Sequence, residues 1–313
     1  MNPTVLHLSF DDFDALSAAA RGWDLDLRPL SRGPFNSGLV QAVTKNAMFA
    51  YAQFGGHLRQ TGSAPPGYRT FGIPAQAGLR FQWRGSKVLG NQIILFPPGG
   101  ELHCFSRPDF EIFTLSLTEG CLEAIAYEQG IAGSRRLFEG GVLNCDPAAV
   151  DRLRTDLANI NCRLTHESAH SSLGQPVETL ESRLAHSLVE VAATSLRRTD
   201  RGTRRRERAL WRVESSLAEN TRRRLSIRDL SLTAGVSVRT LELLFREELG
   251  VSPKRYLRAY RLNNVRRTLQ NANGRPVAIG EIADRWGFTH LSQFAADYRE
   301  LFGERPSETL ASN

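Results

Sequence analysis

The chain has 313 residues, of which 41% are hydrophobic and 23% charged, so it is long enough for two globular domains with sizeable cores. No run approaches 18 consecutive apolar residues, and the start, MNPTVLHLSFDDFD, is acidic, so we expect no membrane span and no signal peptide. The net charge of +7 is uneven, because 24 of the 40 Lys+Arg but 14 of the 33 Asp+Glu residues lie from Arg197 onward. This basic last third indicates either a polyanion-binding module or a solvated basic tail.

Short apolar runs separated by Gly/Pro turns occupy residues 38–117, among them AMFAYAQF, YRTFGIP, LRFQW, NQIILFPPGG, ELHCF and FEIFTLSL. Runs of this length, rich in aromatic and β-branched residues, are typical of strands. We therefore predict a β-barrel or sandwich of the cupin-like, jelly-roll kind over about residues 1–120. The four cysteines lie far apart without a CxxC pair, which favours free thiols in a reducing cytoplasm.

Helical periodicity replaces this pattern over residues 147–198, with Asp146 as a candidate N-cap before Pro147. We expect two antiparallel helices that pack on the barrel or on another subunit, which completes a sensing and dimerisation domain over residues 1–196. The arginine-dense stretch 197–207 then predicts a solvated linker, with DNA-backbone contact as a second interpretation.

Two segments of the last hundred residues repeat each other with an offset of 53 residues. The first, AGVSVRTLELLFREELGVSP, aligns with the second, RWGFTHLSQFAADYRELFGERPS. The matched pairs are Leu241/Phe294, Phe245/Tyr298, Arg246/Arg299, Glu247/Glu300, Leu249/Phe302, Gly250/Gly303 and Pro253/Pro306. Two copies indicate a duplicated supersecondary unit and not a solenoid, which needs three or more.

A short helical stretch precedes each copy. In the first, Ser226 is a candidate N-cap with Asp229 three residues on, and in the second Ile279, Ile282 and Trp286 share one face. A short helix, a glycine-containing turn and a second helix form the helix-turn-helix arrangement, so we predict an all-α tandem helix-turn-helix domain over residues 208–313. A linking helix joins the units. Its expected inward residues are Tyr256, Leu257, Tyr260, Leu262, Val265 and Leu269, and its expected outward residues are Lys254, Arg258, Arg261 and Arg266.

On the first unit, on YRLNNVRRTL and on IADRWGFTHLSQFAADYRELFGERPS, the chain resembles the AraC/XylS transcription regulators over roughly residues 208–310. The resemblance implies a cytoplasmic, homodimeric, ligand-responsive DNA-binding regulator, an activator rather than an enzyme, with promoter DNA, RNA polymerase and a small-molecule effector as partners. It implies no cofactor and no metal. It also implies two recognition helices about one DNA turn apart, which read successive major grooves.

The helical spacing separates buried from outward positions in both recognition helices. We expect Leu241, Leu244 and Phe245 to be buried in the first, and Phe288, Leu291, Phe294 and Tyr298 in the second. The expected DNA-reading positions are Ser237, Val238, Arg239, Thr240, Leu243, Thr289, His290, Ser292, Gln293 and Ala296. Arg239 is the strongest candidate for a guanine contact, and Gln293 could read adenine. Members of the resembled family often carry arginine where this chain has Leu243 and Ala296, so thymine-methyl contacts are expected there.

The effector is less well specified by the sequence. Arg80 and Arg84 match an RxxxR pattern of some cyclic dinucleotide receptors, and on a strand both would share a face suited to phosphate. His57, Glu101 and His103 invite a metal site, but their spacing lacks the compact cluster that such a site needs. A barrel enzyme with an appended DNA-binding domain, and a constitutive DNA binder without an effector, remain the alternative functions.

Overall fold

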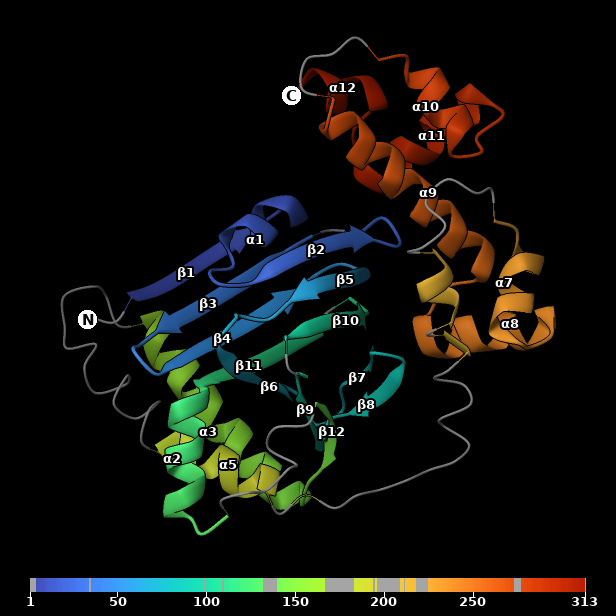
Figure 1. Cartoon of the computed structure of the whole chain (residues 1–313). Coiled ribbons are helices and arrows are strands. Elements are labelled where there is room, and N and C mark those ends of the chain that lie inside the picture. The colour runs from blue at the N-terminus through green and yellow to red at the C-terminus, as the bar shows by residue number, and fades with distance from the viewer. Residues whose placement is uncertain are drawn as a thin grey trace.

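The computed structural model describes residues 4–33, 35–97, 99–108, 110–131, 140–166, 183–193, 195, 209–210, 212–217, 225–272 and 277–312. They form a sheet-rich N-terminal domain and an all-α C-terminal domain (Figure 1). The predicted linker 197–207 lies outside the described residues. In the part of the chain that is described, no helix is both long and apolar enough to cross a membrane.

The N-terminal domain contains two antiparallel sheets. The seven-stranded sheet has the order β1-β3-β4-β11-β6-β9-β12 and the five-stranded sheet the order β2-β5-β10-β7-β8. The strands of the first sheet are β1 (Thr4–Phe10), β3 (Ser37–Val43), β4 (Ala47–Phe54), β6 (Tyr68–Pro74), β9 (Gln92–Leu95), β11 (Phe110–Thr118) and β12 (Gly141–Asn144). Those of the second are β2 (Asp24–Pro29), β5 (Leu58–Ser63), β7 (Arg80–Trp83), β8 (Ser86–Leu89) and β10 (Glu101–Ser106). The predicted sheet-rich fold is confirmed, as two packed sheets and not as one closed barrel.

Burial on both faces explains why the strands of the larger sheet read as nearly continuous apolar runs. In β9, Ile93 and Leu95 contact the helical layer, whereas Ile94 lies between the two sheets. β4 alternates in the same way, with Phe49 on the helical side and Ala50 on the inter-sheet side. The larger sheet is therefore the middle layer of a sheet–sheet–helix sandwich.

The outer layer consists of α2 (Glu119–Glu128), α3 (Pro147–His166) and α5 (Ala185–Ala193), which cluster against the larger sheet in Figure 1. Asp146 caps α3 as predicted, because its carboxylate accepts a hydrogen bond from the Ala149 amide at 3.0 Å. The packing of α3 and α5 on the sheet is confirmed. The sequence pattern missed β1, β2, β12, α2 and the short α1 (Phe13–Ala19).

The C-terminal domain contains two helical clusters joined by one long helix. The first contains described helical residues 209–210 and 212–217, α7 (Ile227–Ala234), α8 (Val238–Leu244) and η3 (Phe245–Leu249), one π-helical turn. The linking helix α9 (Pro253–Gln270) leads to α10 (Ile279–Arg285), α11 (Leu291–Phe302) and α12 (Pro306–Ala311). Each cluster has its own core, to which α9 contributes Tyr256 and Leu257 on one side and Leu262 and Val265 on the other.

Candidate nucleic-acid interface

The first helix-turn-helix unit is fixed by local hydrogen bonds that its sequence predicts. The Ser226 hydroxyl accepts from the Asp229 amide at 3.2 Å, and the Asp229 carboxylate accepts from the Ser226 amide at 2.8 Å. This is the predicted capping box of α7. Gly235 has φ 67, the left-handed conformation that ends a helix without side-chain strain, and it turns the chain into α8.

The predicted reading face of α8 points to solvent. Leu241, Leu244 and Phe245 are buried as predicted. The exposed residues on the other side are Ser237, Val238, Arg239, Thr240 and Leu243. Ser237 and Thr240 are partly engaged already, because the Ser237 hydroxyl caps α8 by accepting from the Thr240 amide at 3.1 Å. Among the described residues nothing is bonded to the Arg239 guanidinium, which leaves it available to a ligand in solution.

The second unit repeats this arrangement with α10 and α11. Phe294 and Tyr298 are buried and Phe288 is half-buried against the Phe294 ring, as predicted. The predicted reading residues are all exposed: Thr289, His290, Ser292, Gln293 and Ala296. The Gln293 amide donates at 2.8 Å to the buried Asp297 carboxylate, which orients that side chain and leaves its amide oxygen as an acceptor. This geometry suits Gln293 to a polar base edge.

Leu291 corrects the predicted burial pattern, because its side chain is 54% exposed. It is the first residue of α11 and lies over Gly280 of α10, where a Cβ atom would come within 3.4 Å of its Cδ1. Gly280 has no side chain that could cover Leu291. The inward stripe of α11 therefore begins at Phe294 and not at Leu291.

The 53-residue repeat is confirmed in the backbone as well as in the core. Gly250 and Gly303 end the two recognition helices with φ of 72 and 81. Pro253 and Pro306 then occupy the first helical position of α9 and α12. A backbone N–H at this position has no partner within the helix, so proline loses no hydrogen bond there. The matched leucine and aromatic residues of the repeat lie in the cores of the two units, and each core supports an exposed face on its second helix.

The linking helix departs from its predicted polarity at two arginines. Arg266 does not point to solvent: its guanidinium pairs with Asp14 at 2.6 Å and Glu304 at 3.2 Å. Arg261 is half-buried and donates to the Leu225 carbonyl at 2.8 Å. A helix pattern shows which residues are apolar, but not that a second domain packs against the charged side.

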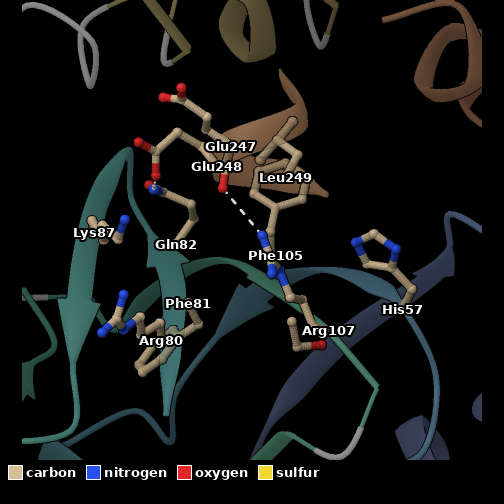
Figure 2. A pocket seen from close by; sticks show the side chains of 11 residues that line it. His57, Arg80, Phe81, Gln82, Lys87, Phe105, Arg107, Glu247, Glu248 and Leu249 are labelled. Atoms are coloured by element: carbon tan, nitrogen blue, oxygen red, sulfur yellow. Dashed lines mark hydrogen bonds between the residues drawn. The ribbon is translucent and has the colours of Figure 1, made fainter. Parts of the chain in front are cut away.

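Arg80 and Arg84 do not share a strand face, because β7 ends at Trp83. Arg84 lies in the hairpin turn with φ 48, and its guanidinium pairs with Glu101 at 2.8 Å. Arg80 instead lines a cavity of about 320 Å³ between the two domains (Figure 2). The structure thus brings Arg80, but not Arg84, to a site where a ligand could bind.

The three residues considered for a metal are also separated. Glu101 is paired with Arg84, His57 lines the interdomain cavity, and the His103 Nε2 lies 3.2 Å from the Glu214 carboxylate. Within the described ranges, no three His, Cys, Asp or Glu side chains converge as a metal site requires.

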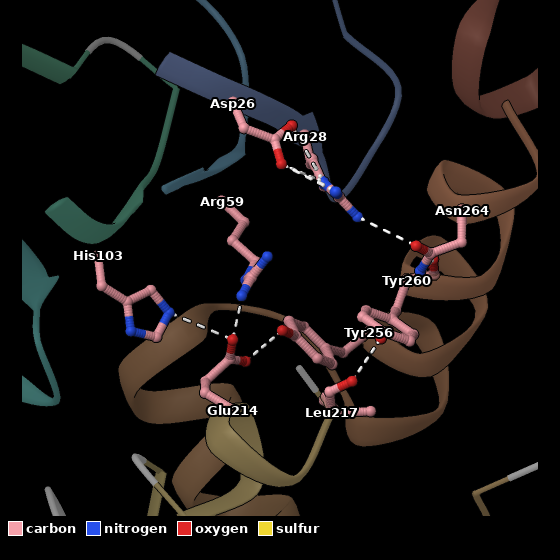
Figure 3. Close-up of polar contacts among 9 residues, drawn as sticks. All are labelled: Asp26, Arg28, Arg59, His103, Glu214, Leu217, Tyr256, Tyr260 and Asn264. Atoms are coloured by element: carbon pink, nitrogen blue, oxygen red, sulfur yellow. Dashed lines mark hydrogen bonds and ion pairs between the residues drawn. The ribbon is translucent and has the colours of Figure 1, made fainter. Parts of the chain in front are cut away.

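Glu214 joins the two domains through a buried polar cluster (Figure 3). Its carboxylate accepts from the Arg59 guanidinium of β5 at 2.8 Å, and the Tyr256 hydroxyl of α9 donates to its other oxygen. Burial alone would raise the pKa of Glu214, but Arg59, His103 and Tyr256 outweigh it and lower the pKa to about 2. Glu214 is therefore a carboxylate that holds a strand of one domain and a helix of the other.

The surrounding contacts extend this junction along α9. The Asn263 amide donates to the Pro29 carbonyl at 3.0 Å. Leu30 and Phe105 of the sheet domain are buried in the core of the first helix-turn-helix unit. Sequence reasoning missed the whole junction, because its partners lie far apart in the chain and no motif marks them.

A second cavity, of about 60 Å³, lies between the two sheets and is almost entirely apolar. Trp23, Phe96 and Trp83 contribute to its lining, and the Trp83 indole nitrogen is buried with no partner among the described residues. Its volume is far below that of most small-molecule sites, so the described conformation holds little more than a few water-sized groups there.

Comparison with known proteins places the matched residues in the C-terminal domain. The helix-turn-helix domain family matches residues 230–312. The XylDLEGF operon transcriptional activator of Pseudomonas putida is 40% identical over 99 residues, which are 32% of this chain and 31% of that protein. A probable thc operon regulatory protein of Rhodococcus erythropolis is 40% identical over 86 residues, 28% of this chain and 26% of that protein. The match thus spans about a third or less of the length of these curated relatives.

Among solved structures, a probable AraC family transcriptional regulator from Rhodopseudomonas palustris CGA009 is 34% identical, with a TM-score of 0.31. That match covers 33% of this chain and 95% of the other chain. The family match over residues 230–312 spans α8, the linking helix α9 and the helices α10 to α12. Residues 230–312 therefore form a helix-turn-helix domain of the kind found in AraC/XylS transcription regulators.

Proposed function

We propose that this protein is a sequence-specific DNA-binding transcription regulator that activates its promoters and reads two successive major grooves with α8 and α11. The observation that carries the proposal is the pair of exposed faces, one around Arg239 and one around Gln293, on two units with the same scaffold. A helix-turn-helix presents its second helix to the major groove. The net charge of the chain from Arg197 onward favours the approach to a polyanion.

The two faces differ in the bases they suit. Arg239 fits guanine, and Gln293 fits adenine through its amide. Leu243 and Ala296, both exposed, favour contact with thymine methyls. A site with unlike half-sites follows from this difference.

The regulatory part of the proposal concerns the N-terminal domain. We propose that it binds a small-molecule effector, that α3 and α5 contribute to a homodimer, and that RNA polymerase is the partner at the promoter, in the cytoplasm. The support is the junction around Glu214, which gives a change in the sheet domain a direct path to the first helix-turn-helix unit. A cyclic dinucleotide at Arg80 and Arg84 is less well supported, since these side chains do not meet.

The test begins with selection of preferred sites from a random DNA pool by the full-length protein. Affinity for the selected site and for a scrambled site is then measured by fluorescence anisotropy. Arg239→Ala is expected to weaken binding to the selected site by about 1–3 kcal/mol and to change binding to scrambled DNA little. Gln293→Ala is expected to relax the preference at one A·T pair of the other half-site.

Arg267→Ala is the matched control, because Arg267 is exposed on α9 and its loss removes the same charge outside both recognition helices. It should lower affinity for both DNAs alike and modestly. Equal losses on both DNAs for Arg239→Ala would make Arg239 a phosphate contact. Failure to enrich any sequence from the pool would overturn the proposed function.

A further inference from the structure

The cavity between the β7–β8 hairpin and η3 has walls of opposite charge. Arg80 lies on β7, Lys87 on β8 and Arg107 just after β10, whereas Glu247 and Glu248 lie on η3 of the DNA-binding domain. Figure 2 shows Arg80 and Lys87 on the hairpin side of the cavity, with the Glu248 carboxylate of η3 next to Gln82. Its volume of about 320 Å³ lies at the lower end of the range for small-molecule sites.

The strand register aims the hairpin at this cavity. Gln82 pairs with Lys87 across the two strands, and Arg80 lies two residues before Gln82, so all three share one face. Across the described ranges no hydrogen bond or ion pair holds Arg80 or Lys87, although both are exposed to the cavity. The neutral Gln82 amide, and not a cation, donates to the Glu248 carboxylate. Two positive charges are thus held on a common face without a partner.

Two buried polar atoms of the same cavity also lack a partner among the described residues, the Gln82 Oε1 and the His57 Nε2. Both side chains are more than nine-tenths buried. The Gln82 orientation is fixed by its donation to Glu248, so its oxygen is an acceptor that needs a donor. Burial, together with Arg107 and Arg255, outweighs a hydrogen bond to the Leu249 backbone and lowers the pKa of His57, which favours the neutral ring. Buried atoms of this kind are usually satisfied by a water, an ion or a ligand.

We propose that this cavity binds a small hydroxylated anion, a hydroxy acid or a polyol phosphate. Its anionic groups would contact Arg80, Lys87 and Arg107, and its hydroxyl groups would donate to Gln82 and His57. All three cations belong to the sheet domain, and both carboxylates belong to the DNA-binding domain. Arg107 donates to the Glu247 backbone carbonyl of η3 at 3.1 Å. A bound anion would compete for Arg107 and repel the carboxylates of Glu247 and Glu248, which loosens the first helix-turn-helix unit from the sheet domain.

The site can be tested without DNA, by isothermal titration of the full-length chain at low ionic strength. The probes are malate and glycerol 3-phosphate, with succinate and inorganic phosphate as anions without hydroxyl groups and glycerol as the uncharged polyol. We expect saturable 1:1 binding of malate or glycerol 3-phosphate, weaker binding of its hydroxyl-free counterpart, and no binding of glycerol. No saturable binding of either hydroxylated anion, or equal binding of the hydroxyl-free anions, would overturn the proposal.

Variants locate the binding. Lys87→Ala and Arg80→Ala are expected to weaken binding at least about tenfold each, since each removes a charge-assisted hydrogen bond. Lys45→Ala is the matched control, because Lys45 is an exposed lysine in the β3–β4 turn of the other sheet. Within the described residues, no hydrogen bond or ion pair holds the side chain of Arg80 or Lys87, so circular dichroism should report intact folds. Equal effects of Lys45→Ala and Lys87→Ala would make the binding non-specific and sink the site.

The coupling rests on the proposed DNA-binding function, and hydrogen exchange separates the two. Saturating malate or glycerol 3-phosphate should accelerate amide exchange in Phe245–Leu249 in the wild type but not in Lys87→Ala. Unchanged or slower exchange there would overturn the loosening. A protein that selects a DNA sequence but binds no anion would sink this inference alone, whereas anion binding without any selected DNA would sink only the proposed function.

Discussion

The two helix-turn-helix units share a scaffold but differ in what holds them. The core of the first includes Leu30 and Phe105 of the sheet domain, and Glu214 ties it to Arg59. The described residues in the core of the second all lie from α9 onward. Among the described residues it meets the sheet domain through Asp14, which accepts from Arg266 and from Gln270 on α9, and through Phe13, whose ring lies under the Arg266 guanidinium. A duplicated sequence has thus produced one unit fused to the sheet domain and one unit suspended from α9.

The two units thus have similar recognition faces but different contacts with the sheet domain. Both units expose an equivalent recognition face, so both can contact DNA. Among the described residues, η3 and the 212–217 helical segment of the first unit hydrogen-bond to strands of the sheet domain. Under the proposed function, a change in the sheet domain reaches the first recognition helix through these contacts and the second unit through Arg266 on α9.

The largest expected effect comes from emptying the core of the second unit. Phe294→Ala should destabilise that unit by about 3–5 kcal/mol, because it leaves a cavity among residues that have no support from the sheet domain. Hydrogen exchange should accelerate in α10, α11 and α12 and stay unchanged in the sheets. Leu241→Ala, at the equivalent position of the first unit, should also accelerate exchange in β10, since Phe105 shares its core. If both variants accelerated amide exchange in the sheets equally, the proposed difference between the two units would be wrong.

Glu214→Gln should weaken the fused unit specifically. It removes the charge opposite the Arg59 guanidinium, which is 13% exposed, and a buried cation without its partner costs about 3 kcal/mol. Urea unfolding of the full chain, followed by tryptophan fluorescence, measures the loss. Glu304→Gln is the matched control in the suspended unit: its carboxylate is 31% exposed and should matter by less than about 1 kcal/mol. Similar losses for both variants would mean that the junction carries no special stability.

The same carboxylate predicts an acid dependence of the junction. The native pKa of Glu214 is about 2, below its ordinary value of 4.5, so its contribution is fully present above pH 4.5. As the pH falls from 4.5 towards 2, the separated or unfolded state takes up the proton first and the contribution is lost. Stability of the wild type should therefore fall more steeply over this window than that of Glu214→Gln. Parallel pH profiles for the two proteins would mean that the Glu214 carboxylate does not contribute to stability over this pH window.

The sequence predicted what local pattern determines. The caps at Ser226 and Asp146, the strand runs and the repeated core follow from residue type and period, and the structure confirms them. The predicted burial of Leu291 was wrong because the residue opposite it is Gly280, which has no side chain to cover it. The prediction for Arg266 was wrong for a related reason. Helical periodicity placed its side chain in solvent, whereas it forms an ion pair with Asp14 of the sheet domain.

Of the candidate sites, the sequence predicted the exposed positions on the helices but not the contacts between the two domains. The reading positions lie on helices whose faces are set by period, so all of them are exposed as expected. The Glu214 junction and the cavity at η3 depend on how two domains pack, and pairs such as Arg59 and Glu214 are 155 residues apart. A single sequence has no period or spacing that would bring them together.

The smallest expected effect sharpens the comparison at the helix starts. α7 begins with the Ser226 cap, whereas Ala278 begins α10 without a side-chain cap, although Glu281 stands three residues on. Ala278 is exposed with φ −84 and ψ 109, an extended conformation that a serine cap also adopts. Ala278→Ser should therefore complete a capping box and slow exchange of the α10 amides, with a gain of about 1 kcal/mol, while Ser226→Ala should lose about the same from α7. If Ala278→Ser left exchange in α10 unchanged, the suspended unit would owe its stability to the α9 packing alone, and the difference between the units would not extend to their caps.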